Sequence, residues 1–303
     1  MRTYGVLENG EVIAVKKLNS QPGLVEESFK NELLNLMRAQ HKNIVRLVGY
    51  CYEIRDIVVE YKGELVVAGV QDIALCLEYM QGGTLEELIS DESCGLDWEE
   101  RYKIIEGICQ GLKHLHTGST DPIYHMDLKP ANVLLDKNRI PKIGDFGLSR
   151  LLASTGTFVT QTNSGTLTYM PPEYMHGLQI SSKFDVFSVG VIIIQIIAGL
   201  EGYYNYKCIY KYPQVFIEHV TGNWSKRVQV KKMSTEALLD VQKCINIALR
   251  CVEEDRAKRP TITEIVEELD MIGAGVEVSV AANAAWHIWK SITRCLADVL
   301  NWQ

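Results

Sequence analysis

The sequence changes character near Gln81-Gly82-Gly83, and this change constrains the fold more than any other feature. Before it, short runs rich in β-branched and aromatic residues predict strands. After it, apolar residues recur at the three- and four-residue spacing that is typical of helices. At roughly 150 residues per domain, a chain of 303 residues has room for two lobes. The sequence therefore predicts an α+β protein with a small β-rich lobe followed by a larger helical lobe.

Within the first part, the sequence predicts a small sheet with one helix. Asn9-Gly10 lies between two β-rich runs, which is a strong signal for a hairpin. Apolar residues at helical spacing between Ser28 and Met37 predict a helix. The remaining runs predict four separate short strands: Ile44–Tyr52, Asp56–Val59, Glu64–Val67 and Ile73–Glu78.

The second part predicts several helices with clear ends. Asp97 and Glu100 form a capping-box pattern at the start of one of them. Further helices are predicted at Val186–Ala198, ending at Gly199, at Ala237–Val252, and at Thr261–Ile272. The run Val186–Ala198 is the longest apolar stretch, and its 13 residues fall short of the ~20 that a membrane span needs. It therefore predicts a buried core helix.

Charge and cysteine content exclude some classes of protein. Lys and Arg number 31 against 38 Asp and Glu, which gives a net charge of −7. A nucleic-acid-binding protein that neutralises phosphates shows the opposite balance. The eight cysteines form no Cys-x-x-Cys pair and no zinc-ligand spacing, so they are interpreted as reduced thiols of a cytosolic protein.

Three short segments carry ionisable side chains in an informative order. Lys16 ends the apolar run Val12–Lys16, and Glu32 lies on the helix that follows. The second segment is 125–132, His-Met-Asp-Leu-Lys-Pro-Ala-Asn, and the third is 145–147, Asp-Phe-Gly. Phosphoryl transfer needs a carboxylate for the hydroxyl proton, oxygen ligands for Mg²⁺, a lysine on the phosphates and a glutamate that orients this lysine. The chain supplies each of these residue types.

This set of segments resembles the motifs of eukaryotic protein kinases, in the same chain order. The sequence of residues 125–130 is similar to that of plant receptor-like kinases of the class without Arg before the catalytic Asp. The resemblance runs from residue 4 to residue 272. It implies a two-lobed kinase fold with an N-lobe at 1–79 and a C-lobe at 80–272. Residues 273–303 form an amphipathic tail outside the resemblance.

The resemblance implies a catalytic role for each polar residue of these segments. Asp127 would accept the hydroxyl proton and Lys129 would steady the γ-phosphate. Lys16 would bind the α- and β-phosphates of ATP, with Glu32 as its partner. The two residues expected to hold Mg²⁺ are Asn132 and Asp145, and the adenine site is expected to include Ala14, Leu77 as gatekeeper, Glu78, Met80 and Leu134.

The resemblance also implies structural roles in the second lobe. Glu173 would pair with Arg259, and Asp185 would brace the catalytic loop. His125 and Phe146 would stack with Leu36 and Leu47 in the apolar spine, and Gly147 completes the Asp-Phe-Gly motif.

These implied roles predict an ATP-dependent kinase that transfers the γ-phosphate to protein hydroxyls in receptor-like kinase signalling. Lys129 together with Gly165-Thr166 favours Ser/Thr over Tyr as the acceptor. The segment 165–173 resembles a platform for a protein substrate, which disfavours a metabolic kinase of small molecules. The expected partners are a Ser/Thr protein substrate and a membrane-bound relative. The expected location is the cytosol, or the inner face of the plasma membrane.

Two departures from the family pattern favour a different function. Residues 1–11 hold no glycine-rich loop before the strand of Lys16, so the N-lobe is interpreted as truncated. Such a loop covers the phosphates, and its absence favours a catalytically weak or silent binding module as the alternative. Met126 stands where many kinases have an Arg and cannot pair with a phosphorylated residue. Regulation is therefore expected through the helix of Glu32 or through a partner.

The tail has its own apolar pattern. Trp286, Trp289, Ile292 and Leu296 recur at helical spacing, with charges between them. Such a helix could cover an apolar patch of the same chain, bind a partner or lie on a membrane surface. The interspersed charges exclude a membrane span.

Overall fold

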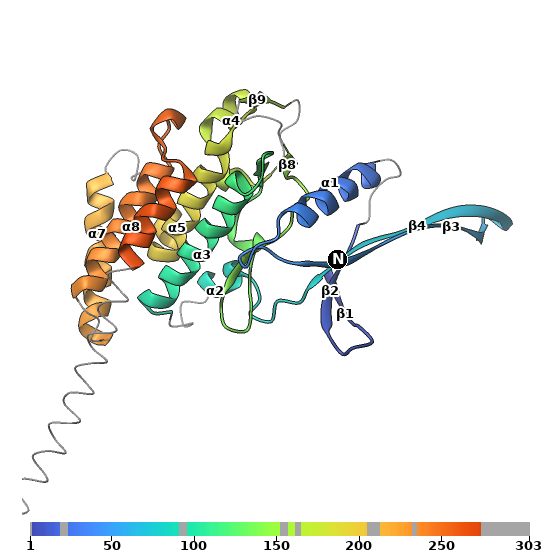
Figure 1. Ribbon diagram of the computed structural model, residues 1–303, viewed down its shortest axis with the longest axis horizontal. Coiled ribbons are helices and arrows are strands. Elements are labelled where there is room, and N and C mark those ends of the chain that lie inside the picture. Colours follow the sequence, from blue (N-terminus) through green and yellow to red (C-terminus); the bar gives the residue numbers. More distant parts are fainter. Residues whose placement is uncertain are drawn as a thin grey trace, which may run out of the picture.

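The computed structural model describes residues 2–18, 24–90, 96–151, 157–160, 165–204, 213–231 and 235–273. It has the predicted two lobes, a small one built on a sheet and a larger helical one (Figure 1). The tail from residue 274 onward lies outside the described residues, so its amphipathic helix stays a prediction.

The small lobe contains one antiparallel sheet with the strand order β1-β2-β4-β3. Asn9 shapes the hairpin between the first two strands, because its side-chain oxygen accepts from the backbone N–H of Glu11 at 2.9 Å. Gly10 follows with a φ of +84°, as the Asn-Gly signal predicts. The elements are β1 (Arg2–Val6), β2 (Val12–Lys17), α1 (Leu24–Arg38), β3 (Leu47–Tyr61) and β4 (Glu64–Glu78).

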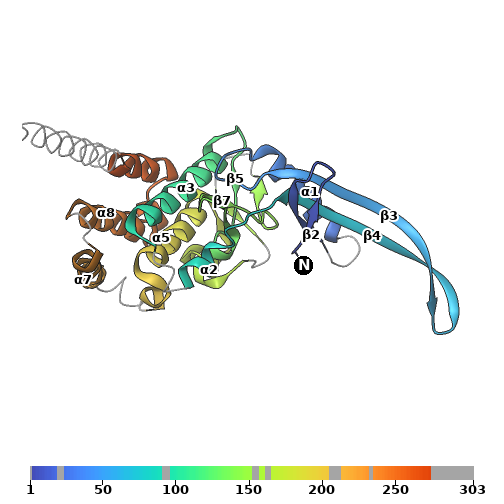
Figure 2. The same cartoon turned by 90° about the horizontal axis from the view of Figure 1, so that it is seen from below.

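Strands β3 and β4 differ from the prediction. The four short runs are joined into two strands of 15 residues each, connected by Lys62 and Gly63. These two residues have φ angles of 54° and 85°, as a tight turn with left-handed central residues requires. Figure 2 shows the hairpin projecting beyond the rest of the small lobe. Since both faces of its outer part are exposed, charges such as Glu60 are tolerated within the strand, and these charges divide the sequence pattern.

The large lobe is built around α5, which packs against α3 and α8. α3 begins with the predicted capping box of Asp97 and Glu100. The helices are α2 (Leu85–Ser90), α3 (Trp98–Thr117), α4 (Pro172–Gly177), α5 (Ser182–Tyr204), α7 (Pro213–Lys231) and α8 (Thr235–Cys251), and residues 262–273 are also helical. The short strands are β5 (Ile123–Tyr124), β6 (Val133–Leu135), β7 (Pro141–Ile143), β8 (Arg150–Leu151), β9 (Phe158–Val159) and β10 (Gln179–Ile180).

The helix α5 forms the centre of the core, as its apolar sequence predicts. The window Ser182–Gly199 is long and apolar enough to cross a membrane, but 78% of it is buried inside the lobe. Its regular part ends at Gly199, which has a φ of +80°. Two buried thiols lie in the same core, and burial raises the pKa of Cys244 and Cys251 to about 12.

Candidate active site

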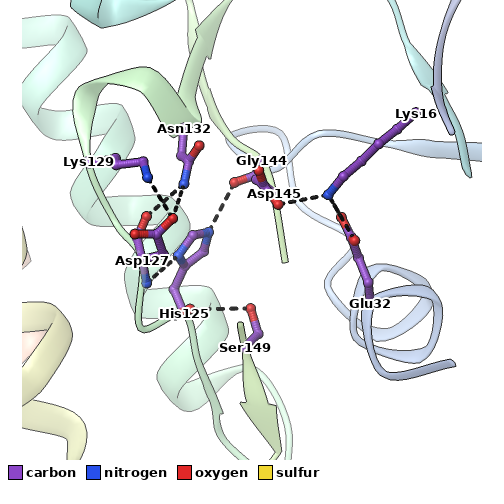
Figure 3. Close-up of polar contacts among 9 residues, drawn as sticks. All are labelled: Lys16, Glu32, His125, Asp127, Lys129, Asn132, Gly144, Asp145 and Ser149. Carbon is purple, nitrogen blue, oxygen red and sulfur yellow. Dashed lines mark hydrogen bonds and ion pairs between the residues drawn. The ribbon is translucent and has the colours of Figure 1, made fainter. Parts of the chain in front are cut away.

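Three distant segments meet at the side chain of Lys16. Its Nζ lies 2.6 Å from Glu32 Oε1 on α1 and 2.7 Å from Asp145 Oδ1 (Figure 3). Lys16 lies on β2, where it pairs with Leu75 of β4 in the centre of the sheet. The sheet, the helix of the small lobe and the Asp-Phe-Gly segment are therefore joined by one ammonium group.

Burial and charge act in opposite directions at this cluster. Burial lowers the pKa of Lys16, but the neighbouring carboxylates of Glu32 and Asp145 outweigh it and raise that pKa above its ordinary value. Burial raises the pKa of Glu32, and Lys16 opposes this shift only in part. Two carboxylates face one ammonium, so the cluster carries a net negative charge. This charge would attract a cation.

The carboxylate of Asp127 is held by three side chains. Lys129 Nζ lies 2.8 Å from Asp127 Oδ2 and donates to the hydroxyl of Thr166, also at 2.8 Å. Thr166 in turn donates to Asp127 Oδ1 at 3.0 Å. The amide nitrogen of Asn132 donates to Asp127 Oδ2 at 3.0 Å and to its backbone oxygen at 2.8 Å. These bonds fix the carboxylate between the loop and the segment that starts at Gly165.

The imidazole of His125 connects Asp127 with the Asp-Phe-Gly segment (Figure 3). Its Nδ1 accepts from the backbone N–H of Asp127 at 3.3 Å, and Nε2 contacts the carbonyl oxygen of Gly144 at 3.0 Å. This assigns the tautomer with the proton on Nε2. The ring also packs edge-on against Phe146, with centroids 5.1 Å apart. The two halves of the site therefore share one buried ring.

Asp185 of α5 braces the loop from below. Its carboxylate accepts from the backbone N–H groups of His125 at 2.8 Å and Met126 at 2.9 Å, and lies 2.9 Å from His116 Nε2. Met126 has a φ of +64°, a conformation that costs free energy and has to be held by its surroundings. Burial raises the pKa of Asp185, but His116 and the amide hydrogen bonds outweigh it, so that pKa lies below its ordinary value.

The side chain of Met126 turns away from solvent into a small apolar cluster. It is 4% exposed and packs in the group that contains Met170, which lies in segment 165–173, and Tyr174, which follows this segment. The sequence indicates only that Met126 cannot receive a phosphate group, whereas in the structure its side chain is a packing residue.

A cavity of about 340 Å³ lies between the lobes, beside Lys16. All five residues expected at the adenine site line it. The side chain of Glu78 points elsewhere, because it pairs with Lys142 at 2.8 Å. The lining residues are Thr3, Tyr4, Ala14, Lys16, Val45, Leu77, Glu78, Tyr79, Met80, Gly83, Thr84, Glu87, Leu134, Gly144 and Asp145.

Several of these lining residues escape sequence reasoning, including Tyr4, Val45 and Thr84. For two of them, the one signal is backbone pairing with a residue that is expected at the adenine site. Tyr4 lies opposite Ala14 in the β1–β2 hairpin, and Thr84 forms an isolated bridge with Leu134. No motif marks Val45.

The structural residues of the large lobe are also brought together. Arg259 is fully buried and binds Glu173 through two bonds, at 2.7 and 2.8 Å. Its remaining N–H groups donate to backbone carbonyl oxygens, among them that of Glu253 at 2.7 Å. Gly147 lies close to the cluster at Lys16, since a Cβ there would come within 3.4 Å of Asp145 Oδ1.

The protein kinase domain model matches residues 3–269, which is most of the chain. The chain belongs to the protein kinase family. This membership confirms the resemblance on which the predicted fold rests, and members of the family use ATP and a divalent metal ion in general.

The relatives of this kinase chain include receptor-like kinases of Arabidopsis thaliana. Cysteine-rich receptor-like protein kinase 44 is 38% identical over 277 residues, which cover 88% of this chain and 68% of that protein. Cysteine-rich receptor-like protein kinase 19 is 35% identical, with 88% and 40% covered. A G-type lectin S-receptor-like serine/threonine-protein kinase is 36% identical, with 86% and 30% covered. The chain thus spans less than half the length of the latter two.

Proposed function

We propose that the chain is a protein serine/threonine kinase that transfers the γ-phosphate of ATP to hydroxyl groups of a protein substrate. The observation that carries this proposal is the joint contact of Lys16 with Glu32 and Asp145. Protein kinases need the lysine–glutamate pair and the Asp-Phe-Gly aspartate in place at the same time. In this chain one ammonium lies within hydrogen-bond distance of both carboxylates.

Nucleotide binding is supported by the cavity next to Lys16. Its apolar lining, with Ala14 on one side and Leu134 on the other, fits a flat base. The backbone N–H of Glu78 donates to the carbonyl oxygen of Arg46 at 3.0 Å, so its own carbonyl oxygen is the group that can accept from an adenine amino group. Lys16 would then contact the phosphates.

The donor set fits Mg²⁺. Asn132 and Asp145 offer amide and carboxylate oxygens, which this ion prefers. Since the amide nitrogen of Asn132 is bonded to Asp127, its amide oxygen can turn to a cation. Within the described part of the chain no group of three or more His, Cys, Asp or Glu forms a metal site, so the phosphates would complete the coordination. Bound Mg²⁺ would neutralise charge on the phosphates.

The arrangement around Asp127 supports a protein hydroxyl as acceptor. Asp127 would orient the hydroxyl and take up its proton, while Lys129 would stabilise the transferred phosphoryl group. Thr166 bonds to both side chains from the segment that resembles a substrate platform. Because the names of all three relatives describe receptor-like kinases, we propose signalling as the context, with a membrane-bound relative as partner at the inner face of the plasma membrane.

The test is phosphate transfer by the purified chain to a Ser/Thr-containing protein in the presence of Mg-ATP. We expect transfer by the wild type and a loss of at least about 10²-fold in both Asp127→Asn and Lys16→Met. Lys17→Met is the matched control, because Lys17 is the next residue on β2 and its side chain is exposed. It should leave the rate unchanged.

A thermal titration with Mg-ATP separates the proposed kinase from the silent binding module. Ligand binding raises the melting temperature by mass action. A rise in the wild type that Lys16→Met abolishes, without any phosphate transfer, would establish the module in place of the enzyme.

A further inference from the structure

The outer part of the β3–β4 hairpin, Glu53–Asp72, is called the ribbon here. Its base joins the sheet, because β2 pairs with β4 from Ala74 to Glu78 and Leu18 adds one bond to Ile73. Between Asp72 and the turn at the tip of the hairpin, no described element pairs with the free edge of β4. Figures 1 and 2 show the ribbon projecting away from both lobes, so that its edges are accessible.

The ribbon exposes more apolar surface than an isolated hairpin usually retains. Val58 and Val67 face each other across the two strands and are 66% and 70% exposed. Leu65 is 78% exposed and Tyr61 60%. Two-stranded hairpins are marginally stable in water, and a third strand or a covering element normally completes them. The ribbon therefore has the properties of half of a larger sheet.

The two edges of the ribbon differ in chemistry. Edge strands usually carry charges or prolines that prevent pairing with another chain. The β3 edge has such charges at Arg55, Asp56 and Glu60. The β4 edge runs from Leu65 to Val70 as Leu-Val-Val-Ala-Gly-Val, without a charge or a proline. The β4 edge is thus the one that is open to strand addition.

The sequence of this edge is complementary to itself. Residues directly opposite in an antiparallel pair point to the same face, so a twofold pairing of two copies aligns odd with odd and even with even numbers. Centred on Val67, the pairing places Leu65 opposite Gly69 and Glu64 opposite Val70 of the second copy. The adjacent register, centred on Ala68, would place Glu64 opposite Asp72, two like charges. Of these two registers, the charges at the ends of the edge therefore favour the one centred on Val67.

We propose that the ribbon is a dimerisation element that pairs with the ribbon of a second copy of this chain through β4, with Val67 on the twofold axis. The two hairpins form a four-stranded sheet with the strand order β3-β4-β4-β3. The apolar side chains of the two ribbons then lie side by side on each face. The hydrogen-bonding groups of both β4 edges are satisfied by each other. This proposal does not depend on kinase activity.

The test is sedimentation of the full chain over a broad range of concentrations. We expect a monomer–dimer equilibrium in the wild type. Val67→Lys places two ammonium groups opposite each other and should weaken dimerisation by about tenfold or more. Val58→Lys is the matched control, because Val58 is the cross-strand partner of Val67, on the same face and about equally exposed, but one strand further from the interface. It should retain the dimer.

A charge exchange makes the test specific for a second copy. Val67→Glu alone should be as weakly dimeric as Val67→Lys, and an equal mixture of both variants should dimerise again. Circular dichroism of each variant checks that the lobes are folded. A monomeric wild type, an equal effect of Val67→Lys and Val58→Lys, or a mixture that stays monomeric would each overturn the proposal. Association only with a different protein would also overturn it.

Discussion

In the body of the two lobes charged side chains such as Glu32 and Arg259 are buried and paired, whereas in the ribbon apolar side chains such as Val67 are exposed. Lys16 depends on Asp145, which lies 129 positions away in sequence, and Arg259 on Glu173, 86 positions away. In the ribbon the contacts join residues that a single tight turn places opposite each other. The buried pairs thus require the complete fold, while the pairing within the ribbon joins residues that are close in sequence.

The buried ion pair should show the largest effect. Glu173→Gln leaves the guanidinium of Arg259 fully buried without its counter-charge, and we expect unfolding to become easier by about 3–5 kcal/mol. The matched control is Arg250→Met, which removes an ion pair of the same lobe whose two side chains are 46% and 36% exposed. Exposed pairs contribute about 0–1 kcal/mol. Chemical denaturation measures both, and equal losses would contradict the contrast between buried and exposed pairs.

The buried carboxylate of Asp185 makes a second contribution to stability, and this contribution depends on pH. Asp185→Asn keeps one acceptor but turns an NH₂ group toward the loop amides, so we expect a loss of about 1–3 kcal/mol at neutral pH. The folded-state pKa of Asp185 is depressed, so the stabilisation by the carboxylate is complete above the ordinary pKa of ~3.9 and is lost as the pH falls below it.

The difference in unfolding free energy between wild type and Asp185→Asn should therefore shrink on acidification below that pH. Asp56→Asn, at an exposed position of the ribbon, should show no such convergence. A constant difference between wild type and Asp185→Asn at all pH values would rule out the carboxylate as its source.

The turn of the ribbon should show the smallest effect. Gly63 has a φ of +85°, a backbone conformation that is strained for alanine. Gly63→Ala should therefore lower the local stability of the ribbon by ~1 kcal/mol. Amide exchange of Val66 should become about fivefold faster, while global stability stays unchanged. Gly49→Ala is the control, because Gly49 lacks a positive φ and a Cβ there meets no atom within 4 Å. A global loss of stability in Gly63→Ala would show that the ribbon is coupled to the lobes.

The sequence predicts the parts of the fold in which local chemistry determines the structure. The predicted capping box at Asp97 is present, and the predicted helix after Thr261 begins with the Thr261 hydroxyl accepting from the backbone N–H of Glu264 at 3.2 Å. The charged residues of the site could be named because their segments resemble the kinase motifs in the same chain order. The predicted sites at Lys16, Asp127 and Asp145 therefore needed no knowledge of packing.

The remaining features depend on information that the sequence pattern does not hold. Val45 and Thr84 line the cavity through backbone paths set by the whole fold, and nothing in their own segments indicates this. The sequence pattern divides the ribbon into short runs because a strand exposed on both faces has no alternation of apolar and polar residues. The sequence shows that Met126 lacks a charge, but its buried contacts appear only in the structure.

The shared ring of His125 makes the two halves of the site cooperative. If Gly144 moved out of reach, the imidazole would lose the acceptor that fixes its tautomer, and the N–H of Asp127 would lose its own acceptor at the same step. A displacement of the Asp-Phe-Gly segment would therefore be felt at the backbone of Asp127 through a single ring, while Lys129, Asn132 and Thr166 still hold its carboxylate.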